Sequence, residues 1–286
     1  MITLKSEHDI EQMKIAGDFL ASIHIALREM IKPGLDMWEI EEYVRKRCKE
    51  DNFLPLQIGV DEGYVNPFPY ATCCCLNDEV AHAFPRHYIL KEGDLLKVDM
   101  VHGLVSKDEL DVSKLDFNDG MAMKKHIEAF RGALADSCWA YAVGTPTDEV
   151  KNLMDVTREC LYRGIAEAKV GNRLGDIGAA IQEYAESKGY GVVRDLVGHG
   201  VGPTMHEDPL VPHYGVRGKG LRLREGMVLT IEPMINTGDW EITNDHTHGR
   251  GYVTADGSLS CQYEHQFAVT AEGPVILTSQ GEEGTY

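Results

Sequence analysis

Five side chains with metal-binding chemistry fall on or beside segments that the sequence predicts to be strands. They are Asp99, Asp136, His199, Glu232 and Glu264. Each one alone could be an ordinary exposed or salt-bridged strand residue. Four carboxylates that converged in a low-dielectric cleft, however, would repel one another strongly unless cations balanced their charge. Two divalent ions balance four carboxylates, and a neutral imidazole adds a ligand without changing that balance, so the set predicts a dinuclear metal site.

The donor atoms in this set indicate which metals would suit it. Oxygen-rich ligation with a single nitrogen and no thiolate fits Mn²⁺, Fe²⁺, Co²⁺ or Zn²⁺ in a two-metal site better than a structural zinc ion. Two such ions about 3.5–4 Å apart can bridge a water, lower its pKa towards about 7 and polarise a substrate carbonyl. The predicted chemistry is therefore hydrolysis of an amide or an ester.

Two of the carboxylates end segments that echo each other. Residues 91–99 and 224–232 each begin with a cation, Glu and Gly, continue through β-rich residues and end on a carboxylate. Upstream, the Lys-Pro-Gly of residues 32–34 is echoed by the Lys-Val-Gly of residues 169–171 at nearly the same offset. The repeat predicts a duplicated unit, in which each copy places a carboxylate residue at an equivalent position.

Apolar periodicity and helix-breaking residues locate the elements that would position these side chains. Helices are expected at about 10–30, 37–49, 146–169 and 174–188. Strands are expected at about 94–101, 135–143, 192–201, 227–235 and 260–270. The predicted strands carry all five metal-binding side chains, and the second helix pair repeats the first.

Composition and charge argue against several other classes of protein. The chain of 286 residues is long enough for a substantial core, and its formal net charge of -18 argues against non-specific binding to nucleic acid or anionic membranes. It contains no apolar run of membrane-spanning length and no signal-peptide pattern at its N-terminus. Its seven cysteines are odd in number and form no Cys-x-x-Cys pair, which fits a reducing compartment. We therefore expect a cytoplasmic protein without nucleic-acid or membrane partners.

Joined motifs around three of the metal-binding residues resemble those of the methionine aminopeptidases. They are Gly198-His199-Gly200-Val201-Gly202 with His206-Glu207-Asp208-Pro209, then Thr230-Ile231-Glu232-Pro233, then Gln262-Tyr263-Glu264-His265. The order Asp, Asp, His, Glu, Glu is similar to the one shared by the whole pita-bread superfamily. The resemblance covers nearly the whole chain, with the segment 105–130 excepted.

The resemblance implies a fold and an activity. The fold is α+β, a pita-bread fold of two pseudo-symmetric halves with a curved antiparallel sheet flanked by helices, in a single catalytic domain over residues 1–286. The activity is removal of the N-terminal methionine from nascent polypeptides, with a preference for a small second residue. The N-termini of nascent polypeptides would be its partners, with contact to the ribosome as a further candidate, and we expect a monomer.

Roles for the metal-binding residues follow from the resemblance. It implies that Asp99 and Asp136 chelate one ion, with Asp136 also reaching the second. His199 would bind one ion only, and Glu264 would bridge both. Glu232 would be both a ligand and the general base for the bridging water.

Roles near the substrate follow in the same way. His82 matches the family histidine that handles the scissile amide or the N-terminal amine. His206 matches the histidine that contacts the carbonyl and stabilises the tetrahedral intermediate. Tyr64, Phe68 and Cys73 fall where the family builds its pocket for the methionine side chain.

The chain departs from the family pattern between its two aspartates. Asp99 and Asp136 lie much farther apart than usual, and Asp108 and Asp111 stand closer to the usual spacing. We prefer Asp136 because residues 132–137 match the family's Gly-x-x-x-Asp-Ser/Thr pattern. Residues 105–130 then form an inserted segment, partly helical towards its C-terminal end. We expect a tolerated surface loop, with a docking surface or a lid as alternatives.

Other readings remain open at this point. The family's pocket tryptophan has no confident counterpart, and Trp240 is one candidate. An X-Pro aminopeptidase or prolidase would share all five metal ligands, but such enzymes usually carry a large N-terminal domain. The short stretch between His206 and Glu232 favours the type I methionine aminopeptidases, and we expect their short bacterial form because the sequence shows no zinc-finger-like N-terminal extension. A non-catalytic scaffold of the same fold would typically have lost ligands, and none of the five is missing here.

Overall fold

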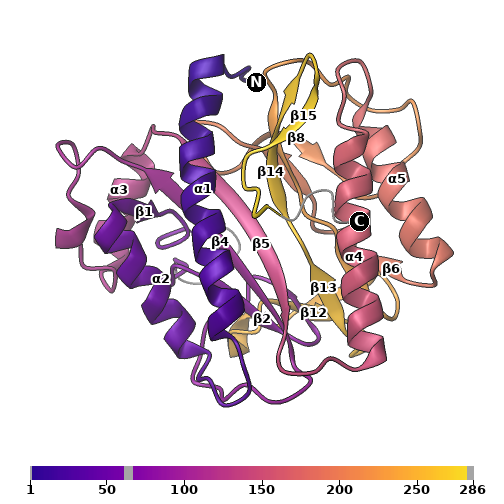
Figure 1. Ribbon diagram of the computed structural model, residues 1–286, viewed down its shortest axis with the longest axis horizontal. Helices are drawn as coiled ribbons and strands as arrows, with labels where there is room; N and C mark the ends of the chain where they lie inside the picture. Colours follow the sequence, from indigo (N-terminus) through magenta and orange to yellow (C-terminus); the bar gives the residue numbers. More distant parts are fainter. Residues whose placement is uncertain (1, 61–66, 282–286) are drawn as a thin grey trace.

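Two helix pairs flank the strands of this molecule. The computed structural model describes residues 2–60 and 67–281. The first pair is α1 (Glu7–Met30) and α2 (Trp38–Asp51), and the second is α4 (Asp148–Ala166) and α5 (Leu174–Ser187). Figure 1 shows the first pair on one side of the molecule and the second on the other, with long strands between them. Both pairs that the sequence repeat predicts are confirmed.

Side-chain caps start the first helix of each pair. Ser6 accepts a hydrogen bond from the backbone N–H of Asp9, whose carboxylate in turn accepts from the backbone of Ser6, forming a capping box. Thr147 accepts from the backbone N–H of Val150 at the start of α4. Each cap satisfies backbone N–H groups that have no partner within the helix.

The first half is built on β4 (Leu95–Leu104), which pairs antiparallel with three other strands. These strands are β1 (Phe53–Pro55), β2 (Cys73–Leu76) and β5 (Leu134–Ala142). Asp99 lies opposite Cys138, and Val101 lies opposite Asp136. Because residues two apart on a strand share a face, this register places Asp99 and Asp136 on one face of the β4–β5 pair.

The second half is built on a five-stranded antiparallel sheet. Its order is β15 (Gly273–Ile276), β14 (His265–Thr270), β9 (Val228–Ile231), β7 (Gly198–Gly200) and β8 (Glu207–Val211). Two three-stranded sheets complete the strands: β13 (Ser260–Gln262), β10 (Met234–Asn236) and β6 (Gly191–Val192), and then β11 (Ile242–Asn244), β12 (Tyr252–Thr254) and β3 (Glu79–Ala81). A single turn of 3₁₀ helix, η2, spans His246–His248.

Three expected strands are each divided into two. Residues 192–201 form β6 and β7, residues 227–235 form β9 and β10, and residues 260–270 form β13 and β14. Glu232 and Glu264 lie in two of these breaks. Pro233 cannot donate to a strand ladder, which ends β9 just before it. The backbone N–H of Glu264 donates to the carbonyl of Cys138 in the other half, at 2.8 Å.

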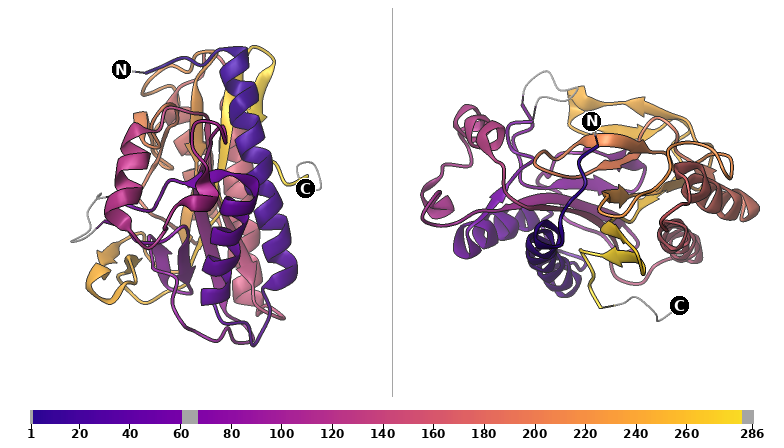
Figure 2. Two further views of the ribbon diagram at one scale, coloured as in Figure 1. Left: turned by 90° about the vertical axis from the view of Figure 1, so that its left-hand side faces the viewer. Right: turned by 90° about the horizontal axis from the view of Figure 1, so that it is seen from above.

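The α+β arrangement that the sequence predicts is therefore confirmed, with helices on one face of the strands. α1 packs against β4 and β5, and α4 packs against β13. Seen from above in Figure 2, α1 and α4 lie along one side of the molecule. One continuous apolar core runs through both halves.

Residues 105–130 form a partly helical segment with many exposed residues. They form η1 (Val112–Lys114) and α3 (Gly120–Ala129), so helical structure near the C-terminal end is confirmed. Asp119 caps α3 by accepting from the backbone N–H of Ala122. The segment contributes buried apolar side chains to the main core: Val112, Phe117, Met123 and Phe130.

Two further findings concern the rest of the chain. Among the helices of the described residues, none is both long enough and apolar enough to cross a membrane. All seven cysteines are free thiols and are buried.

Candidate active site

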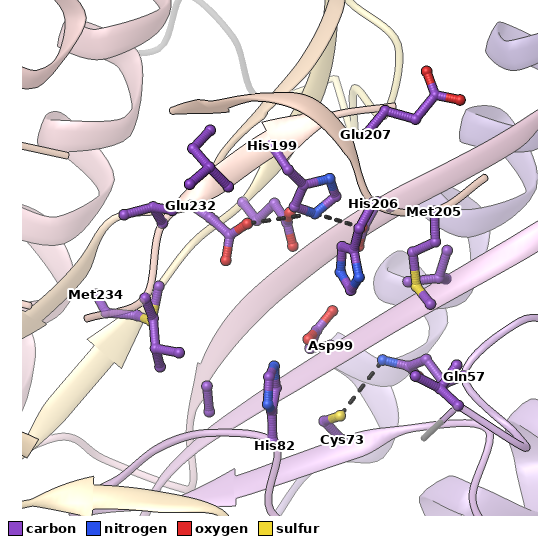
Figure 3. A pocket seen from close by; sticks show the side chains of 18 of the residues that line it. Gln57, Cys73, His82, Asp99, His199, Met205, His206, Glu207, Glu232 and Met234 are labelled. Atoms are coloured by element: carbon purple, nitrogen blue, oxygen red, sulfur yellow. Dashed lines mark hydrogen bonds and ion pairs between the residues drawn. The ribbon is translucent and has the colours of Figure 1, made fainter. Parts of the chain in front are cut away.

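The five metal-binding residues line one cavity of about 440 Å³. Asp99 and Asp136 reach it from β4 and β5 in the first half, and His199 reaches it from β7 in the second. Glu232 and Glu264 enter from the breaks before β10 and β14. Figure 3 shows Glu232, His199 and Asp99 facing the same space, with the carboxylate of Glu207 pointing away from it. The structure thus brings together residues spread over more than half of the sequence.

Three of these side chains are close enough to share one ion. Ligand atoms of Asp136, His199 and Glu264 all lie within 4.8 Å of one another, and all three residues are buried. Nε2 of His199 lies 3.4 Å from Oδ2 of Asp136 and 3.7 Å from Oε1 of Glu232. The imidazole nitrogen therefore points into the group of carboxylates.

The backbone fixes which nitrogen of His199 faces the cavity. Nδ1 lies 3.0 Å from the carbonyl oxygen of Gly200. Because a carbonyl can only accept, Nδ1 donates to it, and Nε2 is the ring nitrogen that faces the carboxylates. This is the arrangement that orients a metal-binding histidine.

Neighbouring groups hold Glu232 at both oxygens and at its backbone. The Thr230 hydroxyl donates to Oε1 at 3.2 Å, and the Gln262 amide donates to Oε2 at 3.3 Å. The backbone N–H of Glu232 donates to Nε2 of His213 at 3.1 Å. His213 is fully buried, and its burial lowers its pKa to about 3, so it is a neutral acceptor.

Burial and mutual repulsion raise the pKa values of the carboxyl groups in this cavity. For Asp99 the causes are desolvation and then the charges of Asp136 and Glu232, which raise its pKa well above its usual range. The same causes raise the pKa of Glu264 well above its usual range and that of Glu232 to about 8. No lysine or arginine appears among the described residues that line the cavity.

These residues fit divalent cations. Oδ1 of Asp99 is buried and has no hydrogen-bond partner among the described residues. Buried carboxylates without a cationic neighbour are unfavourable unless protons or metal ions compensate them. Four carboxylates and one imidazole whose Nε2 faces them are the oxygen-rich donor set that suits Mn²⁺, Fe²⁺, Co²⁺ or Zn²⁺.

The two histidines expected at the substrate also line the cavity. The ring of His206 stands edge-on to that of His199, with centroids 4.4 Å apart. His82 adopts a positive φ of 62°, a backbone conformation that is uncommon for residues other than glycine but that histidine adopts more often than most. Figure 3 shows both imidazoles directed towards the space beside Asp99.

Apolar side chains form the remaining wall. Phe68 and Cys73 line the cavity as expected, whereas Tyr64 lies outside the described residues. Burial raises the pKa of the Cys73 thiol well above its usual range, so this side chain is a neutral, weakly polar surface. Trp240 packs over the guanidinium of Arg194, with 4.8 Å from the guanidinium carbon to the ring centroid, and is not among the lining residues.

Several lining residues were not anticipated from the sequence. They are Gln57, Val60, Ala81, Val101, Leu196, Val197, Met205, Glu207, Asp208, Leu210 and Met234. Most are apolar and look like ordinary core residues in a sequence. Glu207 and Asp208 did carry a signal, because they stand in the His206-Glu207-Asp208-Pro209 motif.

The two competing aspartates lie away from the cavity. Asp108 is exposed, and Asp111 accepts from the Ser113 hydroxyl and pairs with Lys114, contacts that lower its pKa to about 2. Neither residue lines the cavity, whereas Asp136 does. The position of Asp136 supports its selection over both competitors.

Comparisons with known proteins agree with this geometry. The sequence pattern of metallopeptidase family M24 matches residues 11–106 and 111–271. Methionine aminopeptidase A of Synechocystis is 39% identical over 280 residues, which are 97% of each chain. Methionine aminopeptidase 1 of Bacillus subtilis is 37% identical over 278 residues, 97% of this chain and 99% of that one. The chain belongs to metallopeptidase family M24, among the methionine aminopeptidases.

Solved structures of this family support the fold. A methionine aminopeptidase from Streptococci, described as having a novel structural motif, is 74% identical with a TM-score of 0.92 over 100% of both chains. A prolidase from Pyrococcus horikoshii is 21% identical with a TM-score of 0.66, and the match covers 98% of this chain but 64% of the prolidase. The second likeness concerns the fold alone. Together they establish the pita-bread α+β fold.

Proposed function

We propose that this chain is a metal-dependent hydrolase that removes the N-terminal methionine from nascent polypeptides and prefers a small second residue. The observation that carries the proposal is the convergence of Asp99, Asp136, His199, Glu232 and Glu264 in one cavity. An apolar wall adjoins them, and methionine aminopeptidases resemble the chain over nearly its full length.

The same five residues would hold two divalent ions. The number follows from charge balance with four carboxylates, and the donor set leaves Co, Mn, Fe and Zn as candidates. When bound, such ions supply Lewis-acid polarisation of the scissile carbonyl and activation of water. The buried and mutually repelling carboxyl groups described above would lose their extra protons as the ions enter.

The side chains around the ions would divide the proton transfers. Glu232, held by Thr230 and Gln262, would accept the proton of the attacking water at a carboxylate oxygen. His206, beside His199, would donate a hydrogen bond to the developing oxyanion. His82, on the other side of Asp99, would contact the scissile amide or the amine of the substrate.

The apolar wall would receive the methionine side chain. Phe68 and Met205 offer an aromatic edge and a flexible thioether, both favourable contacts for a sulfur-containing chain. Cys73 closes the wall and accepts a hydrogen bond from the Gln57 amide at 3.4 Å. Tyr64 stays a proposed member of this wall.

The cellular context is also part of the proposal. Free thiols throughout fit a reducing compartment, so we place the protein in the cytoplasm, as a monomer. Its partners would be the N-termini of nascent polypeptides, met at the translating ribosome. A net charge of -18 gives no basis for non-specific RNA binding.

The test is turnover of Met-Ala-Ser by metal-stripped protein after addition of Mn²⁺, Co²⁺, Fe²⁺ or Zn²⁺. We expect metal-dependent release of methionine, and at least a hundredfold lower kcat for Glu232→Gln, because the general base is lost. A peptide with a bulky second residue should be cleaved poorly. Isothermal titration with the metal reports whether Glu232→Gln still binds ions.

Two outcomes would contradict the proposal. Activity confined to X-Pro substrates such as Ala-Pro would assign the chain to the prolidase side of the superfamily. No turnover with any of the metals, despite metal binding, would favour a non-catalytic scaffold.

A further inference from the structure

The segment 105–130, predicted above to be an insertion, contacts residues next to the apolar wall of the cavity. None of its residues, all of which the structure describes, lines the cavity. Its apolar side chains Val112, Phe117 and Met123 are nevertheless almost fully buried. A surface loop without a structural role would not bury these apolar side chains in the core.

The start of the segment is pinned to the end of α2. The side-chain amide of Asn52 donates to the carbonyl oxygens of Val105 and Leu110, at 3.0 and 3.2 Å. The side-chain oxygen of Asn52 accepts from the backbone N–H of Val112 at 2.9 Å. These contacts fix the segment relative to the first half.

Helix α3 then meets the chain that leads into the wall. A Cβ placed on Gly59 would lie 2.9 Å from the backbone nitrogen and Cα of Lys124, so the two backbones are in direct contact. The N–H of Gly59 donates to the carbonyl of Phe68, and the N–H of Phe68 donates to the carbonyl of Val60, each at 2.7 Å. Val60 and Phe68 line the cavity.

A second contact reaches the other end of the same wall through Arg45 of α2. Its guanidinium donates to Oδ1 of Asn118 in the segment at 3.0 Å and to the carbonyl of Pro69 at 2.9 Å. It also pairs with the fully buried carboxylate of Glu41. Glu41 in turn accepts from the backbone N–H of Ala71 at 2.8 Å.

The wall is thus held at two points. Pro69 and Ala71 lie between the lining residues Phe68 and Cys73, and Gly59 adjoins the lining residue Val60. Residues of the segment 105–130 contact both points, one directly through Lys124 and one through the Asn118–Arg45 pair.

We propose that residues 105–130 brace the pocket for the substrate's first side chain and so set its selectivity, an inference that rests on the proposed function. Asn118 and the α3 backbone act as positioning elements through Arg45 and Gly59. They contact neither the substrate nor the ions. Weakening the brace would loosen the fit of the methionine side chain while leaving the metal ligands in place.

Two pairs of variants test the brace. Met123→Ala removes a side chain of α3 that is 1% exposed, and Met121→Ala makes the same change on the same helix where the side chain is 65% exposed. Asn118→Ala removes the acceptor for Arg45, and Asn118→Asp restores one. Asn118 is exposed, so its variants keep the fold even if Met123→Ala destabilises it.

We expect Met123→Ala and Asn118→Ala to raise KM for Met-Ala-Ser by about five- to tenfold, with kcat within about twofold of wild type. Discrimination against Leu-Ala-Ser should fall in parallel, and metal affinity should stay unchanged. Met121→Ala and Asn118→Asp should match wild type. Hydrogen exchange of the Gly59 and Phe68 amides should accelerate in the first two variants only.

The outcomes separate this inference from the proposed function. Unchanged exchange at Gly59 and Phe68 in both Met123→Ala and Asn118→Ala would overturn the brace, whatever the turnover. Unchanged KM and selectivity in an enzyme that releases methionine would also overturn it. Failure of the wild-type protein to release methionine with any metal would instead refute the proposed function. The hydrogen-exchange measurements would still test whether residues 105–130 hold the wall in place.

Discussion

At the scale of single residues, one hydroxyl group orients two of the proposed metal ligands. The Oγ1 of Thr230 accepts from the backbone N–H of His199 at 3.1 Å and donates to Oε1 of Glu232 at 3.2 Å. Thr230 is fully buried on β9, so water cannot replace these contacts. Such outer contacts hold a metal ligand in the geometry that binding requires.

Replacing this hydroxyl should weaken the site without removing a ligand. We expect Thr230→Val to lower metal affinity or kcat/KM by about 10–100-fold, because the shape is kept while both hydrogen bonds are lost. Thr230→Ser, which keeps the hydroxyl, should stay close to wild type. Isothermal titration with Mn²⁺ and turnover of Met-Ala-Ser provide the measurements. Equal behaviour of the two variants would show that the hydroxyl has no orienting role.

At the scale of elements, α1 fixes the C-terminal part of the chain to the first half. A Cβ placed on Gly17 would lie 1.9 Å from the carbonyl oxygen of Leu277, just after β15. Farther along α1, the Arg28 guanidinium donates to the side chain of Gln280 at 2.9 Å. Only a residue without a side chain allows this close approach of helix and strand.

Two glycine substitutions separate this packing effect from helix propensity. Alanine favours a helix over glycine by about 1 kcal/mol, yet Gly17→Ala would force a methyl group into backbone atoms that cannot move aside easily. We expect it to lower the free energy of unfolding by about 2 kcal/mol or more. Gly120→Ala, at the first position of α3 with nothing within 4 Å, should change it by less than about 0.5 kcal/mol.

Chemical denaturation followed by circular dichroism measures both changes. Equal stability of the two variants would mean that α1 and the residue after β15 separate enough to admit a methyl group. The contact between α1 and Leu277 would then hold the C-terminal part of the chain less closely than the structure indicates.

At the scale of the whole molecule, the two halves meet at the proposed metal site. The N–H of Glu264 donates to the carbonyl of Cys138, and the Ser137 hydroxyl donates to the carbonyl of Glu264 at 3.0 Å. The N–H of Asp136 donates to the side chain of Gln266 at 3.0 Å. Ions bound between these halves would add to their attachment, because binding to the folded state alone stabilises it.

The stabilisation by metal should grow with pH. Without metal, burial and mutual repulsion raise the pKa of Glu232 to about 8 and that of Asp99 well above its usual range. A carboxyl group whose pKa is raised by folding contributes stability that is present at low pH and lost as pH rises towards the folded value. The metal-free protein therefore loses this contribution between about pH 4.5 and pH 8, the window in which ions can replace the protons.

We expect the rise in Tm on adding Mn²⁺ to be small near pH 5.5 and larger at pH 8. At a hundredfold excess over Kd the gain is about 2.7 kcal/mol. Burial lowers the pKa values of His24, His102 and His213 to about 3, so folding holds them neutral. The stability that these three histidines contribute is lost as pH falls below about 6.5. The loss is the same with and without metal, so it cancels in the difference in Tm between the two forms.

Calorimetry of metal-free and Mn²⁺-loaded protein at three pH values makes this measurement. Glu232→Gln, which cannot ionise at this position, should show a flatter dependence on pH. A rise in Tm that is the same at every pH would indicate that ion binding displaces no protons from these carboxyl groups.

Much of the site could be read from the sequence. His199, Glu232 and Glu264 stand in short motifs that resemble those of the methionine aminopeptidases, and the family's spacing around Asp136 favoured it over Asp108 and Asp111. Both helix pairs also followed from apolar periodicity, because that signal is local to each helix. These features depend on residues that are neighbours in the chain.

Other features were decided only by tertiary structure. The expected strand over 227–235 breaks at Glu232 because Pro233 ends one ladder and the next strand joins a different sheet. Val60, Leu196 and Met234 line the cavity, although nothing distinguishes them in sequence from core residues. Val112, Phe117, Met123 and Phe130 of the segment 105–130 join the main core, and no local pattern marked them for it. Contacts between distant segments depend on how whole elements pack, and a local pattern of residue types carries no record of the partner that each apolar face will meet.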